Sequence, residues 1–269
     1  MRARLSLVLS LLVLATPSLA TLALAAPQCP VPQRLSFQVE REVRRDTPGF
    51  TQGLEYHDGA LFEGTGNVYG DTRINRIDMT TGKVTPLYDA GKDYFGEGLT
   101  FFGGRAYQLS WREGKVFVFD SRMTPLREMQ NPRDGWGLTH DADGLIASDG
   151  SSRLFFLSPR DFTTRRSLRV VRAGRYVENL NELEYVDGAV WANIFESWNI
   201  VKIDPVSGCV TAEANLEGLR ARMRPADRRY IESEANFVLN GIAHDPGTGL
   251  FTLTGKYWPM LFTGRFKAR

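Results

Sequence analysis

The sequence predicts an all-β protein made of five similar units, and three observations carry this prediction. A large or polar residue, then Gly (once Glu), then Leu or Ile recurs five times along the chain. Each copy continues into a turn and a second apolar run, as in a β-hairpin. The copies are spaced by 45, 39, 45 and 59 residues, aligned at Gly53, Gly98, Gly137, Glu182 and Gly241. Units of about 45 residues with four strands are typical of propeller blades, so we expect a five-bladed β-propeller with four-stranded blades.

Further strand pairs follow three of the hairpins. The turns between Asp78 and Gly82 and between Asp204 and Gly208 carry Asp for local hydrogen bonding and Gly for positive φ. The segment from Leu157 to Asp161 is a looser version of the same turn. A solenoid is the main alternative architecture, but solenoid repeats are usually shorter and seldom hold four strands.

Residues 1–25 have the features of a secretory signal peptide. Arg2 and Arg4 precede a largely apolar run from Leu5 to Ala15, and small residues end at a cleavage site of the A-x-A type at Ala25. A membrane anchor is the alternative, but the run is interrupted before it reaches the roughly 20 apolar residues that a span needs. We therefore expect an exported protein, periplasmic or secreted, with no membrane attachment after cleavage. Residues 26–269 should form a single propeller domain.

The remaining segments each have an expected place. Residues 35–45 alternate apolar with charged residues and should pair into the last unit, closing the ring as an N-terminal strand. Cys29 and Cys209 are the two cysteines. Export favours one disulfide between them, with two unpaired thiols as the alternative. The longest gap between repeats carries an insertion, roughly residues 215–234, which we expect to be a surface loop with a short helix over one face.

Charge and metal-ligand content exclude several classes of function. The chain has 33 Lys and Arg against 31 Asp and Glu, without a basic block, so we expect no nucleic-acid partner. Two cysteines and three scattered histidines are too few for the usual four-ligand zinc site. We expect no metal, no cofactor and a monomeric protein.

Polar residues converge on the predicted propeller axis. The residue before the aligned position of each repeat should reach the axis from its own blade; these residues are Gln52, Glu97, Trp136, Asn181 and Asn240. Buried polar groups need partners, and a carboxylate near the axis should have a perturbed pKa. The alternative to a functional site is a polar plug whose members satisfy one another, or a water-filled channel.

Seven motifs in this chain resemble those of plant-type glutaminyl cyclases. They are FTQGL at Phe50, FGEGLT at Phe95, GWGL at Gly135, LNELEY at Leu180, VWAN at Val190, LNGIA at Leu239 and TGKYWP at Thr254. The resemblance runs from about residue 37 to residue 262, nearly the whole predicted mature chain. It implies a five-bladed propeller that cyclises the N-terminal glutamine of peptides or proteins to pyroglutamate, with release of ammonia and without a catalytic metal.

The resemblance also implies roles for four polar residues. It places the catalytic carboxylate at Glu97, which would shuttle one proton from the attacking α-amine to the leaving nitrogen. It places amide-bearing partners at Gln52 and Asn181 and an active-site lysine at Lys256. These three could polarise the amide carbonyl and hold the developing oxyanion.

Aromatic residues should form the walls of the substrate pocket. The resemblance assigns these walls to Phe50, Trp111 and Trp136. The chain departs from the family at Phe195, where the family commonly has tryptophan. The aromatic face is kept at this position, but the indole N–H donor is lost, which affects the expected substrate affinity more than the reaction.

Two alternatives from other functional classes remain open. A calcium-dependent propeller hydrolase of the lactonase type needs several carboxylates on the axis, and among the five ring positions only Glu97 is one. A propeller that only binds a partner would not need Glu97, Lys256 and aromatic walls together.

Overall fold

The computed structural model describes residues 29–66 and 70–269. The predicted signal peptide, residues 1–25, lies outside the described residues. None of the helices in the described part of the chain has the length and apolar character needed to cross a bilayer.

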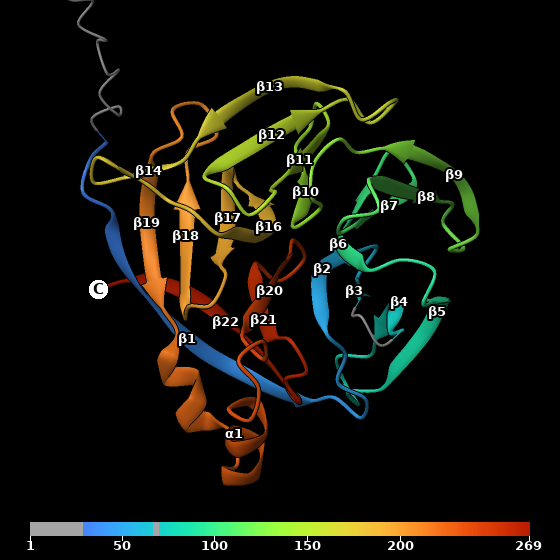
Figure 1. Cartoon of the computed structure of the whole chain (residues 1–269). Helices are drawn as coiled ribbons and strands as arrows, with labels where there is room; N and C mark the ends of the chain where they lie inside the picture. The colour runs from blue at the N-terminus through green and yellow to red at the C-terminus, as the bar shows by residue number, and fades with distance from the viewer. Residues whose placement is uncertain (1–28, 67–69) are drawn as a thin grey trace, which may run out of the picture.

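Three separate four-stranded antiparallel sheets follow one another along the chain, arranged around a common centre (Figure 1). The first holds β2 (Thr51–His57), β3 (Ala60–Thr65), β4 (Thr72–Ile77) and β5 (Val84–Gly91). The second holds β6 (Gly96–Phe102), β7 (Arg105–Ser110), β8 (Lys115–Phe119) and β9 (Pro125–Gln130). The third holds β10 (Leu138–His140), β11 (Leu145–Ala147), β12 (Arg153–Leu157) and β13 (Thr164–Arg169).

The rest of the chain forms an eight-stranded sheet and a small hairpin. The strand order in the large sheet is β16 (Leu180–Val186), β17 (Ala189–Ile194), β18 (Asn199–Ile203), β19 (Val210–Asn215), β1 (Gln33–Arg44), β22 (Met260–Ala268), β21 (Leu250–Gly255) and β20 (Leu239–Asp245). The hairpin pairs β14 (Val171–Arg172) with β15 (Arg175–Tyr176). The fold is therefore all-β and propeller-like, as the repeats predicted.

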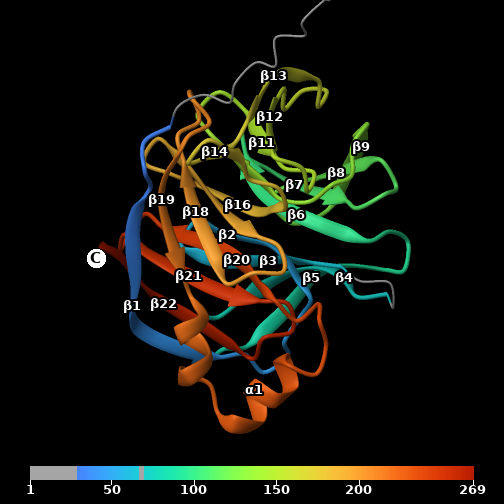
Figure 2. The same ribbon diagram turned by 60° about the vertical axis from the view of Figure 1, so that its left-hand side comes forward.

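Strand β1 joins the two halves of the large sheet. It pairs antiparallel with β22 from Leu35 opposite Ala268 to Arg44 opposite Met260. Its first residues also pair in parallel with β19, where Gln33 lies opposite Ala212. Figure 2 shows β1 and β22 side by side along the same edge of the molecule. The start and the end of the described chain thus share one sheet.

The first strand of each repeat lies at the centre of the molecule. β2 contacts β6 and β20, β10 contacts β6 and β16, and β16 contacts β20, so these strands form a closed circuit. They approach very closely: a Cβ on Gly53 would lie 2.3 Å from the backbone nitrogen of Leu99. Since real Cβ atoms do not come so near, the repeat needs glycine at this position.

Glu182 replaces glycine in the fourth repeat, and the structure gives a reason. Its buried carboxylate accepts a hydrogen bond from the backbone nitrogen of Leu54 in β2 (3.2 Å) and another from that of Ile242 in β20 (2.8 Å). A single side chain on β16 therefore satisfies backbone groups of two other central strands. Such hydrogen bonds matter because an unpaired buried N–H would be costly.

The insertion after β19 contains the predicted short helix. It folds as a 3-10 helix, η1 (Glu217–Arg222), followed by α1 (Pro225–Ile231), at the bottom of Figure 1. Proline at the first helical position has no N–H to leave unpaired, which suits it to start α1. Arg44 of β1 donates two hydrogen bonds to Asp227 at 2.7 and 3.0 Å, so the helix is attached to the sheet.

Cys29 and Cys209 form a disulfide that closes a span of 180 residues. The predicted bond is confirmed, and the alternative of two unpaired thiols is wrong. The bridge attaches the segment before β1 to the turn between β18 and β19.

Candidate active site

A cavity of about 480 Å³ brings together all eight residues predicted for the site. They are Phe50, Gln52, Glu97, Trp111, Trp136, Asn181, Phe195 and Lys256. Gln52, Glu97 and Asn181 come from the first residues of the central strands β2, β6 and β16, so the repeat itself delivers them to one end of the axis. Phe50 and Trp136 precede the central strands β2 and β10, and Trp111, Phe195 and Lys256 directly follow β7, β17 and β21.

Glu97 and Gln52 form the buried polar centre of the cavity. The Gln52 side chain donates a hydrogen bond from Nε2 to Oε1 of Glu97 at 3.0 Å. Only 5% of Glu97 and 2% of Gln52 are exposed. The amide therefore fixes the position of the carboxylate before any ligand enters.

Asn240 occupies a different place from the other ring positions. It is completely buried and does not line the cavity. Its Nδ2 donates to the backbone oxygen of Thr51 at 3.0 Å and to Oε1 of Gln52 at 3.4 Å. Because the Gln52 oxygen accepts from Asn240, its amide nitrogen is turned toward Glu97. The expectation that all five ring residues meet at one place is therefore wrong for Asn240, which lies behind Gln52.

Burial raises the pKa of Glu97 well above its ordinary value of 4.5. The positive charge of Lys256 acts in the opposite direction, and the negative charges of Glu113 and Asp134 raise the pKa further. A raised pKa favours the protonated form, so this buried carboxyl group is a candidate for exchanging a proton with a ligand.

Lys256 lies between two aromatic rings. Its Nζ is 4.7 Å from the centre of the Phe50 ring and 4.8 Å from that of Phe195. Only 4% of the residue is exposed, and burial lowers its pKa to about 8, against the opposing effect of Glu97. A cation held by ring faces keeps its donors available for a ligand.

Aromatic pairs form the walls. Trp136 meets Phe195 edge to face at 5.4 Å between ring centres, and Trp111 lies 5.3 Å from Phe95. Asn181 completes the interior, and its buried Oδ1 has no hydrogen-bond partner among the described residues. An unpaired buried acceptor beside a cavity is a place where a ligand N–H would be stabilised.

Sequence reasoning missed one wall of the cavity. Glu234, Asn236 and Phe237 line it from the end of the insertion. Phe237 packs on Tyr257 at 4.9 Å, and its backbone oxygen accepts a hydrogen bond from Nε1 of Trp258 at 2.9 Å. These residues belong to no repeat, so only the position of the insertion directly before β20 could have pointed to them.

A second set of buried carboxylates lies farther along the central strands. Glu55, Glu182 and Glu184 accept hydrogen bonds from backbone N–H groups of neighbouring strands. Burial raises the pKa of Glu55 to about 8 and those of Glu182 and Glu184 well above 4.5. Their backbone partners indicate that they hold the central strands together.

The cavity therefore combines a buried carboxyl group whose pKa is raised, a buried lysine and aromatic walls in an all-β, propeller-like scaffold. Such a combination is typical of the active site of an enzyme that binds a small group between aromatic rings. The chain belongs to the glutamine cyclotransferase family, which its sequence matches over residues 10–266.

Two relatives agree with this family. The chain is 37% identical over 236 residues to a glutaminyl-peptide cyclotransferase from Arabidopsis thaliana, covering 86% of this chain and 71% of the relative. It is similar in structure to the glutaminyl cyclase of Myxococcus xanthus, with a TM-score of 0.78 and 33% sequence identity. That match covers 88% of this chain and 99% of the Myxococcus chain.

Proposed function

We propose that this protein is a glutaminyl-peptide cyclotransferase. It converts the N-terminal glutamine of peptides or proteins to pyroglutamate and releases ammonia. The observation that carries the proposal is the buried Glu97 carboxylate, held by Gln52 and facing Lys256 inside an aromatic cavity. The family and the relatives support the same activity.

Glu97 is the proton shuttle in this proposal. The substrate's α-amine attacks its own side-chain amide carbon, and the carboxylate of Glu97 takes the proton that the amine loses. The C–N bond to the leaving nitrogen then breaks, and Glu97 returns the proton so that ammonia departs. General acid–base catalysis of this kind contributes about 10²- to 10⁴-fold.

The other polar residues orient the substrate and stabilise charge. Lys256 is the cation nearest the reaction and stabilises the oxyanion that forms during attack. Asn181 Oδ1 accepts a hydrogen bond from a substrate N–H. Gln52 acts on Glu97 directly through its 3.0 Å hydrogen bond, so we assign it to positioning the carboxylate.

The aromatic walls hold the glutamine side chain in a curled conformation. Phe50, Trp111 and Trp136 enclose it, and Phe195 adds an aromatic face without an N–H donor. Ring closure is intramolecular, so restricting the side chain to a reactive conformation supplies much of the remaining acceleration.

We propose that the reaction needs no metal or cofactor. The residues that line the cavity supply a proton carrier, Glu97, and a cation, Lys256, which together cover the two tasks that a metal ion performs in other amide chemistry. In residues 29–66 and 70–269, no three His, Cys, Asp or Glu side chains are grouped so as to hold a metal ion. A calcium-dependent hydrolase or a purely binding propeller is not favoured by the family assignment.

We also propose a five-bladed propeller whose fifth blade is completed by β1. The closed circuit of central strands and the pairing of β1 with β22 support this assignment. Residues 1–25 would be the signal peptide and residues 26–269 the single mature domain, a monomer in the periplasm or the extracellular medium. Mass spectrometry of exported protein tests the cleavage site, since an intact Met1 would contradict it.

Ammonia release from a peptide that begins with glutamine tests the activity. We expect release in the presence of EDTA and of 1,10-phenanthroline, accompanied by a loss of 17 Da from the peptide, the mass of ammonia. A calcium-dependent enzyme would lose activity in EDTA, and a binding module would release no ammonia. Loss of activity that zinc restores would contradict the metal-free mechanism.

A further inference from the structure

The insertion places a carboxylate at the mouth of the cavity. Glu234 lines the cavity from the turn that connects α1 to β20, and its side chain is exposed. It forms no ion pair within the described part of the chain. Its charge is therefore available to a ligand that extends out of the cavity.

The turn that carries Glu234 is held in place. The backbone nitrogen of Phe237 donates to the oxygen of Glu234 at 3.1 Å, which fixes the turn. Phe237 packs between Tyr230 of α1 at 5.3 Å and Tyr257 at 4.9 Å. Glu234 is thus presented at a defined position on the wall.

Two other carboxylates near Trp111 already have partners. Glu113 accepts hydrogen bonds from the backbone nitrogens of Phe95 (2.9 Å) and Arg112 (3.1 Å). Asp134 lies 3.8 Å from Arg112, an exposed pair that leaves its charge only partly offset. Neither Glu113 nor Asp134 lines the cavity, whose lining includes Glu97 and Glu234 as its acidic residues.

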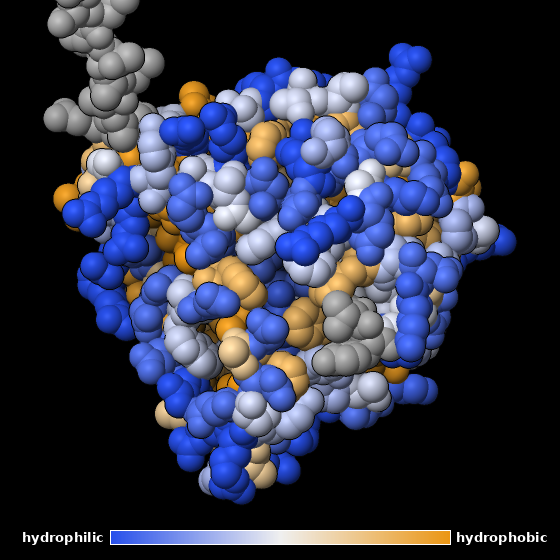
Figure 3. All heavy atoms as spheres, viewed as in Figure 1, coloured by the Kyte–Doolittle hydropathy of each residue, from blue (hydrophilic) through white to orange (hydrophobic). Residues whose placement is uncertain are grey.

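In the view of Figure 3, hydrophobic residues gather near the centre of the face, and hydrophilic ones surround them. A substrate glutamine enclosed among the cavity's aromatic residues must send the rest of its chain outward past such a polar rim. The residues that follow the glutamine would therefore meet Glu234, which lines the cavity and is exposed.

We propose that Glu234 forms a subsite for a cationic side chain, so that the enzyme favours peptides with Lys or Arg directly after the N-terminal glutamine. The inference rests on the proposed cyclotransferase function and specifies the substrates of that site. Exposed ion pairs contribute little to the free energy of binding. Replacing Glu234 should therefore lower the preference for these peptides, measured as a ratio of kcat/KM values, by about two- to five-fold. Complementary charge acts mainly on encounter and affinity, so it affects KM more than kcat.

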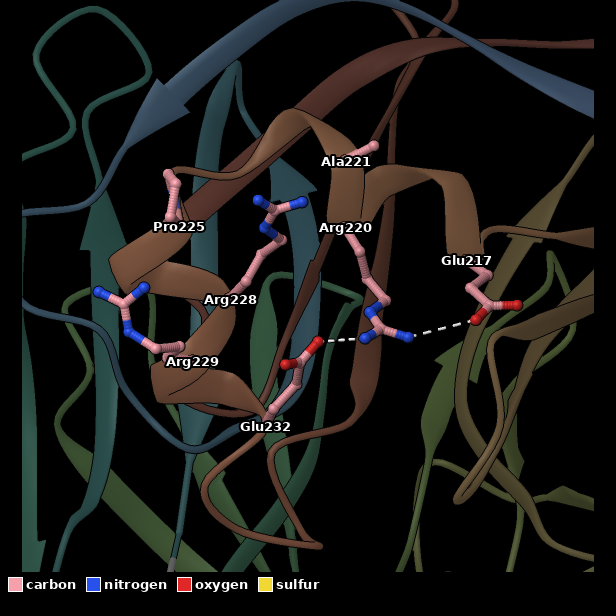
Figure 4. A pocket seen from close by; sticks show the side chains of 7 residues that line it. All are labelled: Glu217, Arg220, Ala221, Pro225, Arg228, Arg229 and Glu232. Carbon is pink, nitrogen blue, oxygen red and sulfur yellow. Dashed lines mark hydrogen bonds and ion pairs between the residues drawn. The ribbon is translucent and has the colours of Figure 1, made fainter.

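A second acidic residue of the insertion provides a matched control. Glu232 is also exposed, but it pairs with Arg220, which in turn bonds Glu217 in a separate cleft of the insertion (Figure 4). Its charge is already compensated and it does not line the active-site cavity. The Glu232→Gln variant removes the same charge from the same segment without touching the proposed subsite.

The experiment compares kcat/KM for three peptide amides, Gln-Lys-Ala, Gln-Ala-Ala and Gln-Glu-Ala. We expect the wild-type protein to prefer the lysine peptide over the alanine peptide and the alanine peptide over the glutamate peptide. The Glu234→Gln variant should lower the ratio of lysine to alanine peptide by about two- to five-fold through KM, and Glu232→Gln should keep the wild-type ratio. Raising the salt concentration from about 0.02 M to about 0.5 M strengthens the screening of charges. This change should reduce the wild-type ratio of kcat/KM for the lysine peptide to that for the alanine peptide.

The outcomes separate this inference from the function on which it rests. Turnover of the alanine peptide with no charge preference would overturn the subsite alone. An equal loss of preference in Glu234→Gln and Glu232→Gln would also overturn it, because a general field effect would then be the cause. Absence of ammonia release from all three peptides would overturn the proposed function and the subsite together.

Discussion

Nε2 of Gln52 donates a hydrogen bond to Oε1 of Glu97 across 3.0 Å, and both side chains are almost fully removed from water. The other end of the Gln52 amide is fixed by Asn240. The carboxylate is therefore oriented by a chain of two amides from neighbouring repeats. Preorganisation of this kind allows one buried acid to serve as both acceptor and donor of a proton.

Replacing Glu97 by glutamine should abolish the proton transfer and leave the fold intact. The side chains are nearly the same size, so we expect kcat to fall by about two to four orders of magnitude with a modest change in KM. Steady-state kinetics and thermal melting on the same preparation measure both effects. Glu128→Gln, at an exposed carboxylate on β9, serves as the control. Near wild-type turnover in folded Glu97→Gln protein would contradict the assignment and favour a polar plug.

The charge of Lys256 should set the alkaline limit of kcat/KM. Because its pKa is about 8, the side chain is protonated below this pH and loses its charge above it. Since kcat/KM reports groups of the free enzyme, we expect kcat/KM to fall above about pH 8 in the wild-type protein. Lys256→Arg keeps the charge to much higher pH, so its kcat/KM should lack this decline. The same alkaline decline in both proteins would show that another group is responsible.

The buried carboxylates should make the folded state less stable as pH rises. Glu55 has an ordinary pKa of 4.5 and a folded-state pKa of about 8, so the native state keeps a proton that the unfolded state releases. Its stabilising contribution is complete below pH 4.5 and is lost as pH rises to about 8. Lys256 makes the folded state more stable as pH rises, but only above about pH 8, where it loses its proton in the folded state and keeps it in the unfolded state.

Measuring the melting temperature between about pH 5 and pH 8 tests the expected loss of stability. This window lies between the ordinary and the folded-state pKa of Glu55. We expect a steady decline in the wild-type protein and a smaller one in Glu55→Gln, which has no proton to lose at that position. Glu128→Gln should keep the wild-type slope, since its carboxylate is exposed. A wild-type melting temperature that rises with pH over this range would be inconsistent with the raised pKa values.

Reducing the disulfide should lower the melting temperature. The bond closes a span of 180 residues, for which the chain-entropy model gives at most about 5 kcal/mol. In a domain of this size that is a decrease on the order of 10 °C. Scanning calorimetry with and without a reductant measures it. A Cys29→Ser, Cys209→Ser double variant should melt at the lower temperature and show no response to the reductant.

The repeat pattern predicted the polar centre of the cavity, and the family resemblance added Lys256 and most of the aromatic walls. Three residues of the polar centre occupy equivalent places at the start of central strands: Gln52, Glu97 and Asn181. Because these strands are arranged in the same way around the axis, the three side chains meet at one end of it. The same argument failed for Asn240. Asn240 holds the equivalent position in the fifth repeat. Its short amide side chain, however, bonds the backbone of Thr51 and the side chain of Gln52 and does not line the cavity.

The sequence did not reveal two other groups of residues. Glu234 and Phe237 lie outside the repeats, and their place depends on how α1 is attached to β1. Glu55 and Glu184 lie on central strands, but a glutamate within a strand is normally assigned to the solvent side. Only the contacts between strands show that their carboxylates accept backbone hydrogen bonds in the interior.

The pairing of β1 with β22 has a consequence for how the protein is made. β1 leaves the ribosome before the other described strands, but the strand that it accompanies over most of its length is the last to be synthesised. Until then, an amphipathic edge of about a dozen residues stays open to pairing with other chains. A nascent chain stalled before residue 260 would therefore contain all eight predicted site residues, but β1 would have only its short parallel pairing with β19. Such truncated products should be selectively captured by chaperones or degraded by proteases.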